Sequence, residues 1–172
     1  MIDLKAYIRD VPDFPTPGIL FRDITPLLHD PRAFGAALDE MAAYVRSRAV
    51  DAVIGIESRG FLFGAPIAQR LALPFVPIRK PGKLPASRMT VEYSLEYGSG
   101  QLDIHADALK SGDRVVIVDD LLATGGTAHA ASKLVELLGA VVDSHLFLIE
   151  LAPLAGRRLL AGYEVHAVVR YE

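Results

Sequence analysis

Residues 115–127 read VVIVDDLLATGGT, and this stretch decides the fold class of the chain. Its β-branched start is typical of a buried strand, and its small residues open a helix that we expect over 127–138. Glycines let backbone N–H groups approach an anion closely, and a helix N-terminus adds partial positive charge there. The pattern therefore predicts a strand, a phosphate-binding loop and a helix. We expect the phosphate contacts from Ala123, Thr124, Gly125, Gly126 and Thr127.

The loop differs from two familiar nucleotide-binding motifs. No lysine follows its second glycine, as a Walker P-loop requires, and its spacing is not GxGxxG. The adjacent Asp119 and Asp120 suit a sugar diol or a hydrated Mg²⁺ complex, because successive side chains diverge. Either half of the string alone also fits a strand end with acidic turn residues and a capping threonine. The whole string favours a phosphosugar site.

Outward from this stretch, short strands alternate with helices, which predicts an α/β fold with a mostly parallel sheet flanked by helices. Gly98 to Gly100 is expected as a hairpin turn, and the Pro-rich stretch 14–26 as an irregular shaped loop. Asp3 and Asp30 are expected helix caps. The predicted strands are 52–56, 75–78, 91–97, 101–104, 114–118, 141–149 and 165–169. The predicted helices begin at Asp30 (to about Arg48), at about Phe61 (to Leu71) and, as a short piece, near Leu154.

Composition limits the class of protein. The 172 residues are 51% hydrophobic and 23% charged, which fits one globular domain over 1–172. The absence of cysteine excludes a disulfide scaffold and a thiolate metal site, and it favours the reducing cytoplasm. A net charge of −3 gives no global attraction for nucleic acid, and no apolar run approaches a membrane span. We expect a soluble, unexported protein with neither nucleic acid nor membrane as a partner.

A second polar turn, ESRG at 57–60, follows the expected strand 52–56. Its backbone N–H groups, hydroxyl and guanidinium suit a pyrophosphate, although the same residues also form an ordinary capped turn. The stretch 79–87 is rich in glycine, proline and lysine and is expected to be mobile, with cations that can close over an anion. The five histidines show no metal-ligand spacing, so no protein-built transition-metal site is expected. The candidate pyrophosphate ligands are Glu57, Ser58, Arg59, Gly60, Arg79, Lys80 and Lys83.

The string VVIVDDLLATGGT resembles the ribose-5-phosphate binding motif of the phosphoribosyltransferase family. FPTPGILFRDITPLL, IESRGFLFGAPIA, IRKPGKLP, YSLEYGS and the terminal Tyr171-Glu172 match the family in order. YSLEYGS with ESRGF favours the adenine-using members over the hypoxanthine and guanine members. The resemblance implies transfer of phosphoribose from 5-phosphoribosyl-1-pyrophosphate to adenine, giving AMP and pyrophosphate. It also implies a homodimer and Mg²⁺ held by substrate oxygens, with waters bridging to Asp119 and Asp120.

The resemblance assigns further roles. It implies an N-terminal hood over about 1–30 that covers the base, and a mobile loop and hairpin over about 79–105. It implies that Arg79 reaches pyrophosphate from the neighbouring subunit, and that Arg22 pairs with Glu96 beside the base. The implied base-binding residues are Leu20, Phe21, Arg22 and Leu121. The implied catalytic residues are Glu96, Arg59 and Lys80.

Two alternatives stay open from the sequence. The base can be another purine, such as xanthine, hypoxanthine or guanine, since base choice depends on backbone geometry. The second alternative is a ligand-sensing regulator on the same fold that binds nucleic acid. A DNA-binding version is expected to carry an additional recognition domain and an RNA-binding version a basic face, whereas this chain carries a net charge of −3.

Overall fold

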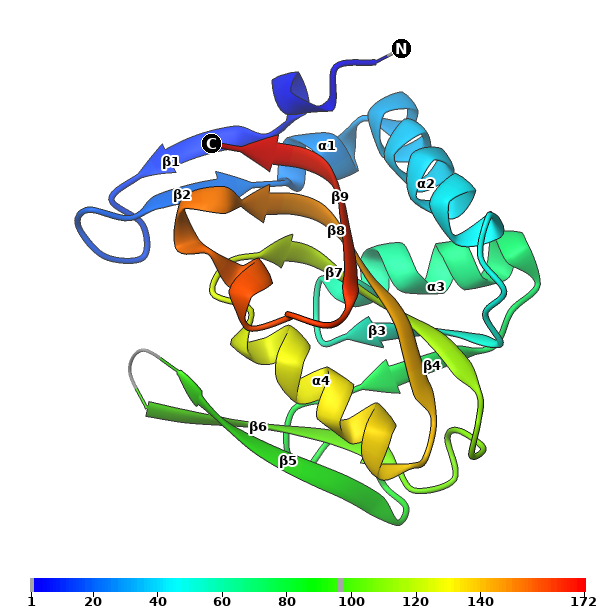
Figure 1. The fold of residues 1–172 in the computed structure, drawn as a ribbon. Helices are drawn as coiled ribbons and strands as arrows, with labels where there is room; N and C mark the ends of the chain where they lie inside the picture. The colour runs from blue at the N-terminus through cyan, green and yellow to red at the C-terminus, as the bar shows by residue number, and fades with distance from the viewer. Residues whose placement is uncertain (1, 96–97) are drawn as a thin grey trace. The chain divides into compact units, whose positions relative to one another are not determined.

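The computed structural model describes residues 2–95 and 98–172, and the chain divides into two compact units, Met1–Glu40 and Met41–Glu172. The second unit is built on a five-stranded parallel sheet in the order β4-β3-β7-β8-β9 (Figure 1). This confirms the predicted α/β class. The strands of the sheet are β3 (Ala52–Ile56), β4 (Phe75–Ile78), β7 (Arg114–Leu122), β8 (Val141–Leu151) and β9 (Glu164–Tyr171).

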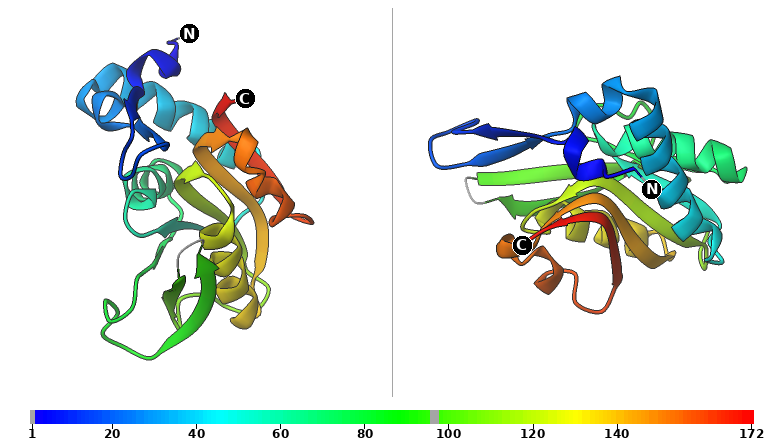
Figure 2. Two further views of the ribbon diagram at one scale, coloured as in Figure 1. Left: turned by 90° about the vertical axis from the view of Figure 1, so that its left-hand side faces the viewer. Right: turned by 90° about the horizontal axis from the view of Figure 1, so that it is seen from above.

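Two helices cover the sheet. α3 (Gly60–Leu71) connects β3 to β4 and α4 (Gly126–Leu137) connects β7 to β8, in opposite directions along the strand order. Because crossovers between parallel strands are right-handed, the two helices cover opposite faces of the sheet (Figures 1 and 2). Adjacent strands β3 and β7 therefore mark the point where the winding reverses. Ligands of open α/β sheets bind outside the carboxyl ends of strands at such a point.

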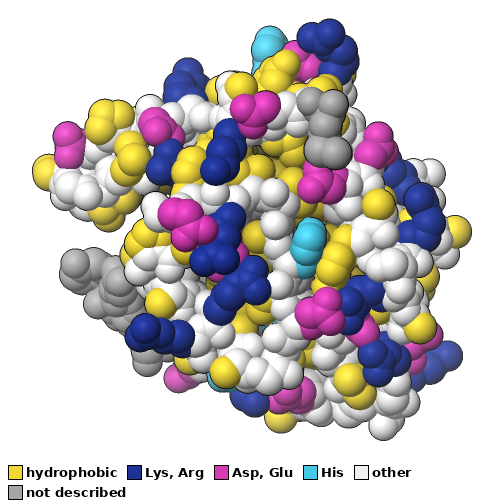
Figure 3. Space-filling model, turned by 45° about the horizontal axis from the view of Figure 1, so that its top comes forward, with side chains coloured by type: hydrophobic (Ala, Val, Ile, Leu, Met, Phe, Trp, Pro, Cys, Tyr) yellow, Lys and Arg dark blue, Asp and Glu magenta, His cyan; other side chains and the backbone are white. Residues whose placement is uncertain are grey.

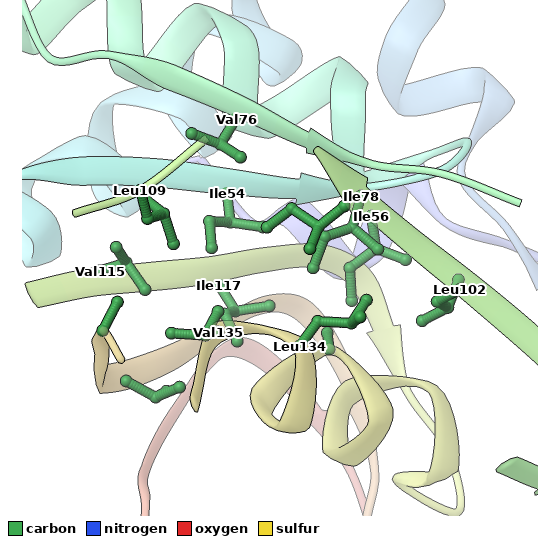
Figure 4. Packing of buried hydrophobic residues seen from close by; sticks show 14 of the residues in the cluster. Ile54, Ile56, Val76, Ile78, Leu102, Leu109, Val115, Ile117, Leu134 and Val135 are labelled. Atoms are coloured by element: carbon green, nitrogen blue, oxygen red, sulfur yellow. The ribbon is translucent and has the colours of Figure 1, made fainter. Parts of the chain in front are cut away.

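The core between α4 and the sheet fixes where α4 lies along the sheet and which side of the helix faces it. Leu134 and Val135 of α4 are fully buried and face Ile54 and Ile117 of the central strands (Figure 4). Burying each such side chain contributes about 1.5–3 kcal/mol. The N-terminus of α4 is thereby held at the carboxyl end of β7.

An antiparallel hairpin, β5 (Arg88–Leu95) with β6 (Gly98–His105), follows β4 and packs beside α4. The prediction that Gly98 to Gly100 forms the turn is wrong, because these residues belong to β6 and Gly98 pairs with Leu95. Gly100 serves a close approach instead. A Cβ on Gly100 would lie 2.6 Å from Cζ of Tyr93, whose ring covers the glycine.

The N-terminal unit contains regular structure where the sequence predicted only a loop. β1 (Arg9–Pro12) pairs with β2 (Leu20–Asp23) as a second hairpin, and α1 (Thr25–His29) follows. The prolines do not prevent this, because Pro12 ends β1 and Pro26 occupies the first turn of α1, where a missing N–H is tolerated.

Both predicted caps are present. The Asp3 side chain accepts from the Lys5 N–H ahead of η1 (Leu4–Tyr7), and Asp30 accepts from the Arg32 and Ala33 N–H groups at the start of α2 (Pro31–Arg46).

One further helix differs from expectation. The stretch near Leu154 forms two single 3₁₀ turns, η2 (Ala152–Leu154) and η3 (Gly156–Arg158), separated by Ala155 with φ of 53°. This left-handed residue interrupts any continuous helix. Within the part of the chain that the structure describes, no helix is long and apolar enough to cross a membrane.

Candidate active site

A cavity of about 450 Å³ opens where β3 and β7 end. Both polar loops predicted from the sequence contribute to it, as the reversal of winding between these strands requires. Its lining is Glu57, Ser58, Arg59, Lys80, Tyr93, Leu102, all residues of 119–128, and Phe147.

The glycine-rich loop lies between β7 and α4. Gly125 is the N-cap of α4 with φ of 88°, a left-handed conformation that favours glycine, and its carbonyl accepts from the His129 N–H at 2.9 Å. The first turn of a helix leaves its backbone N–H groups without intrahelical acceptors. The loop thus presents amides, the partial charge of α4 and the hydroxyls of Thr124 and Thr127 on one side of the cavity, an arrangement suited to a phosphate.

The two acids lie within β7, which runs to Leu122 rather than ending at Val118 as predicted. The alternation of a strand makes their side chains diverge. Asp120 is buried and its Oδ2 lies 2.7 Å from Nε of Arg59, while the Asp120 N–H donates to Oδ1 of Asp119 at 2.9 Å. The ESRG turn and the acidic strand end are therefore joined by an ion pair.

Both aspartates have a raised pKa. Burial raises the pKa of Asp119 well above its ordinary value, and the neighbouring charge of Asp120 raises it further. Burial also raises the pKa of Asp120, against the opposing effect of the Arg59 guanidinium. Arg59 offsets only part of the cost of ionising these two carboxyl groups. Hydrogen bonds donated by a ribose diol, or the charge of a solvated cation, can stabilise their ionised forms further.

Glu57 organises the cationic segment beside the cavity. Its Oε2 accepts from the Lys80 backbone N–H at 2.9 Å and from Nε of Arg79 at 3.2 Å. The Lys80 hydrogen bond, followed by that of Arg79, holds the pKa of Glu57 below its usual range. An Arg79 Nη1–H also donates to the Lys83 carbonyl at 3.4 Å. An ionised Glu57 thus holds Lys80 at the cavity rather than offering a ligand for an anion.

Three predicted pyrophosphate ligands lie outside the cavity lining: Gly60, Arg79 and Lys83. Gly60 has a separate reason to be glycine, because a Cβ there would lie 2.7 Å from the Val118 carbonyl oxygen and 3.0 Å from Oδ1 of Asp119. It lets the N-terminus of α3 approach the end of β7 closely.

Sequence reasoning missed five lining residues: Leu122 and Ala128 beside the phosphate loop, and Tyr93, Leu102 and Phe147 elsewhere in the chain. The Tyr93 hydroxyl lies 3.5 Å from Oγ1 of Thr127, which links the β5–β6 hairpin to the phosphate loop. Tyr93 lies inside the YSLEYGS segment, so the motif carried a signal for it. Leu102 and Phe147 are almost fully buried wall residues with no distinguishing pattern in the sequence.

The expected base-binding residues divide between the two units. Leu121 lines the cavity, whereas Leu20, Phe21 and Arg22 lie on β2 of the N-terminal unit. There Arg22 forms an ion pair with Asp10, its cross-strand partner, and the Phe21 ring packs edge-on to Phe14 with centroids 5.1 Å apart. Glu96 lies outside the described residues, so its pairing with Arg22 stays a prediction.

Among residues 2–95 and 98–172, no group of three or more histidine, cysteine, aspartate or glutamate side chains is placed to hold a metal ion. The Asp119–Asp120 pair nevertheless fits a cation that keeps its waters, since Mg²⁺ commonly binds one or two carboxylates together with substrate phosphates.

Comparisons with known proteins identify the family of this chain. The family of phosphoribosyl transferase domains matches residues 27–158. The adenine phosphoribosyltransferase of Carboxydothermus hydrogenoformans is 56% identical over 99% of this chain and 100% of its own. The crystal structure of the Thermoanaerobacter pseudethanolicus enzyme of that name has a TM-score of 0.96 at 53% identity, covering 98% of both chains.

A more distant relative was solved with ligands. The adenine phosphoribosyltransferase of Saccharomyces cerevisiae, complexed with an imino-altritol bisphosphate and adenine, is 39% identical with a TM-score of 0.90 and covers 96% of both chains. The family match, the identity over nearly the whole length and the shared fold establish that this chain belongs to the phosphoribosyltransferase family, among its adenine phosphoribosyltransferases.

Proposed function

We propose that the cavity at the ends of β3 and β7 carries out the family's reaction, in which 5-phosphoribose passes from 5-phosphoribosyl-1-pyrophosphate to adenine. The products are AMP and pyrophosphate. One observation carries this assignment: a phosphate-type loop, the Asp119–Asp120 pair and an arginine-bearing turn line a single cavity. The yeast relative's complex with adenine supports adenine as the base.

The 5-phosphate is assigned to the loop from Ala123 to Thr127. Backbone amides and the helix terminus neutralise this group, while the Thr124 and Thr127 hydroxyls fix its orientation. Binding of the 5-phosphate in this loop thereby positions the anomeric carbon in the cavity.

Asp119 and Asp120 are assigned to the ribose hydroxyls and, through water, to Mg²⁺. The bond to pyrophosphate breaks with positive charge developing on the ribose, so carboxylates near the ring stabilise that charge. Mg²⁺, when bound with the substrate, supplies charge neutralisation to the pyrophosphate oxygens. Neither acid needs to transfer a proton in this role.

Pyrophosphate is assigned to the side of the cavity made by Ser58, Arg59 and Lys80. The Arg59 guanidinium already lies against Asp120, so it can contact the leaving group while remaining beside the acid pair. Lys80, held by Glu57, adds a second positive charge. Gly60 is assigned to this wall as a support and Lys83 as a cation that approaches from the 79–87 segment, while Arg79 is assigned to the pyrophosphate of the neighbouring subunit.

Base binding is assigned to Leu121 of the second unit and to the hood residues Leu20, Phe21 and Arg22. Stacking between apolar side chains and hydrogen bonding to backbone groups can select the purine edge. Adenine must lose its N9 proton as it attacks the anomeric carbon. Glu96 is the carboxylate assigned to orient the base and stabilise this step.

The remaining assignments rest on resemblance and composition. We infer a homodimer, in which Arg79 acts at the partner's site. The whole of 1–172 is assigned to one functional domain, with a hood over about 1–30 and a mobile loop and hairpin over about 79–105. A chain without cysteine fits the cytoplasm.

Adenine is expected to be used at least roughly a hundredfold better than hypoxanthine or guanine, a difference of about 2.7 kcal/mol in the transition state. Misdirecting one or two buried hydrogen bonds accounts for this amount. The test measures kcat/KM for each base with saturating sugar pyrophosphate and Mg²⁺. Comparable values for hypoxanthine contradict the base assignment, and absence of any nucleotide product contradicts the reaction.

The rival role, a nucleic-acid-binding regulator, finds less support. On the face drawn in Figure 3, Lys and Arg side chains lie among Asp and Glu side chains. The net charge is −3. The same assay separates the roles, because a regulator that only senses the ligand binds AMP without forming it.

A further inference from the structure

The segment 152–158, which no sequence motif singled out, lies directly behind the phosphate loop. A Cβ on Gly156 would lie 2.3 Å from the Ala123 carbonyl oxygen and 2.9 Å from Cδ1 of Leu122. A Cβ on Gly125 would in turn lie 2.6 Å from the Gly156 carbonyl oxygen. The two backbones are therefore in direct contact, with no side chain between them to absorb a shift.

The Arg157 guanidinium attaches this segment to the sheet through three hydrogen bonds, to Glu150 and Val165, which we call the Arg157 fork. Arg157 donates from Nε to Oε1 of Glu150 at 2.7 Å and from Nη2 to Oε2 at 2.8 Å, and its Nη1 donates to the Val165 carbonyl at 2.8 Å. Glu150 is buried on β8, and in the sheet it is the cross-strand partner of Leu122, the last residue of β7. The Arg157 hydrogen bonds hold the pKa of Glu150 below its usual value.

Apolar packing completes the attachment. Leu160, four residues beyond Gly156, is buried in a cluster with Leu122, Ala128 and Phe147. Two of these flank the phosphate loop, at the end of β7 and in the first turn of α4. Neither Gly156 nor Arg157 lines the cavity in the described part of the chain.

We propose that Gly156 and Arg157 are positioning residues, and that the 152–158 segment is a rigid support that sets the shape of the phosphate loop from behind. This inference rests on the proposed function, which places the 5-phosphate in that loop. Backbone amides bind an anion only in the directions in which the loop aims them, so a displacement of about 1 Å can cost up to a hundredfold in rate.

Gly156→Ala tests the support without changing any charge. Its φ is not in the left-handed region, so the added methyl acts by its contacts with Ala123 and Leu122 at the end of β7 and the start of the phosphate loop. We expect KM for the sugar pyrophosphate and Kd for AMP to rise about tenfold or more, with KM for adenine changing less than about threefold. Gly35→Ala is the control, because a Cβ there meets nothing within 4 Å.

Arg157→Met tests the fork, and Arg158→Met is its matched control. Arg158 is the exposed neighbouring arginine, so its loss removes the same charge near the anion site and leaves the fork intact. Arg157→Met is expected to raise KM for the sugar pyrophosphate at least about fivefold, whereas Arg158→Met changes it less than about twofold. If Arg157→Met does not fold, the double variant Glu150→Leu/Arg157→Met removes both charges and leaves neither one buried alone.

The outcomes separate this inference from the proposed function. AMP formation by the parent protein, with unchanged phosphosugar KM and AMP affinity in folded Gly156→Ala and Arg157→Met (or the double variant), overturns the support role alone. Equal losses for adenine and for the sugar pyrophosphate also overturn it, since they indicate general damage. No AMP formation by the parent protein overturns the proposed function itself.

Discussion

Gly125→Ala is expected to weaken AMP binding by about a thousandfold. Gly125 has φ of 88°, and a Cβ there would lie 2.6 Å from the Gly156 carbonyl oxygen, so the loop backbone must move away from its support. The left-handed conformation alone costs an L-residue about 1–2 kcal/mol. That strain lowers folding stability, whereas the loss of affinity comes from misdirecting two amides that bind a charged phosphate, at about 1.5–3 kcal/mol each. Isothermal titration with AMP measures the loss.

The chain offers a matched control for this substitution. Gly112 has the same φ of 88°, yet a Cβ there meets nothing within 4 Å. Gly112→Ala therefore carries a similar conformational strain and is expected to leave AMP affinity unchanged. If a folded Gly125→Ala protein binds AMP as tightly as Gly112→Ala does, the phosphate assignment of the loop is wrong.

Asp119→Asn is expected to lower kcat/KM for the sugar pyrophosphate by roughly a hundred and fiftyfold, while making the empty protein more stable at neutral pH. The loss corresponds to about 3 kcal/mol, the contribution of one or two charged hydrogen bonds to the ribose. Asparagine keeps the oxygen that accepts from the Asp120 N–H. Steady-state kinetics with each substrate, compared between parent and variant, measures the first effect.

The stability effect follows from the raised pKa of Asp119. Between the ordinary pKa of about 4 and the raised folded value, the unfolded chain has lost a proton that the folded protein retains. Folding stability therefore falls as pH rises through this window, and it stays reduced above it. Asp119→Asn removes that fall, so its gain over the parent protein appears above about pH 4 and grows toward neutral pH.

Urea unfolding at several pH values measures this difference. Asp107→Asn, at an exposed position, changes the net charge by the same amount and serves as the control. An Asp119→Asn protein that is less stable than the parent across the whole range contradicts the electrostatic account. In that case Asp119 acts only as an ordinary strand-end residue.

The sequence by itself determined the class of the fold and the elements with strong local signals. Ala52–Ile56 and Phe75–Ile78 have the predicted bounds, because short apolar runs bounded by polar and glycine residues define a buried strand locally. The loop 123–127 was likewise evident, since its conformation depends on glycine and on the helix that follows. Asp3 and Asp30 were readable as caps for the same reason.

Only the tertiary structure decided how these pieces form a site. The pairing of β3 with β7 brings Arg59 to Asp120, 61 positions apart in the sequence by their numbering, and no local pattern encodes strand order. Pairing with β8 extends β7 through both acids to Leu122. Contact with Gly156 supplies a constraint on Gly125 that its own neighbours do not show. Each of these features depends on residues distant in the chain, whose contacts form when burial of the sheet faces sets the strand order and register.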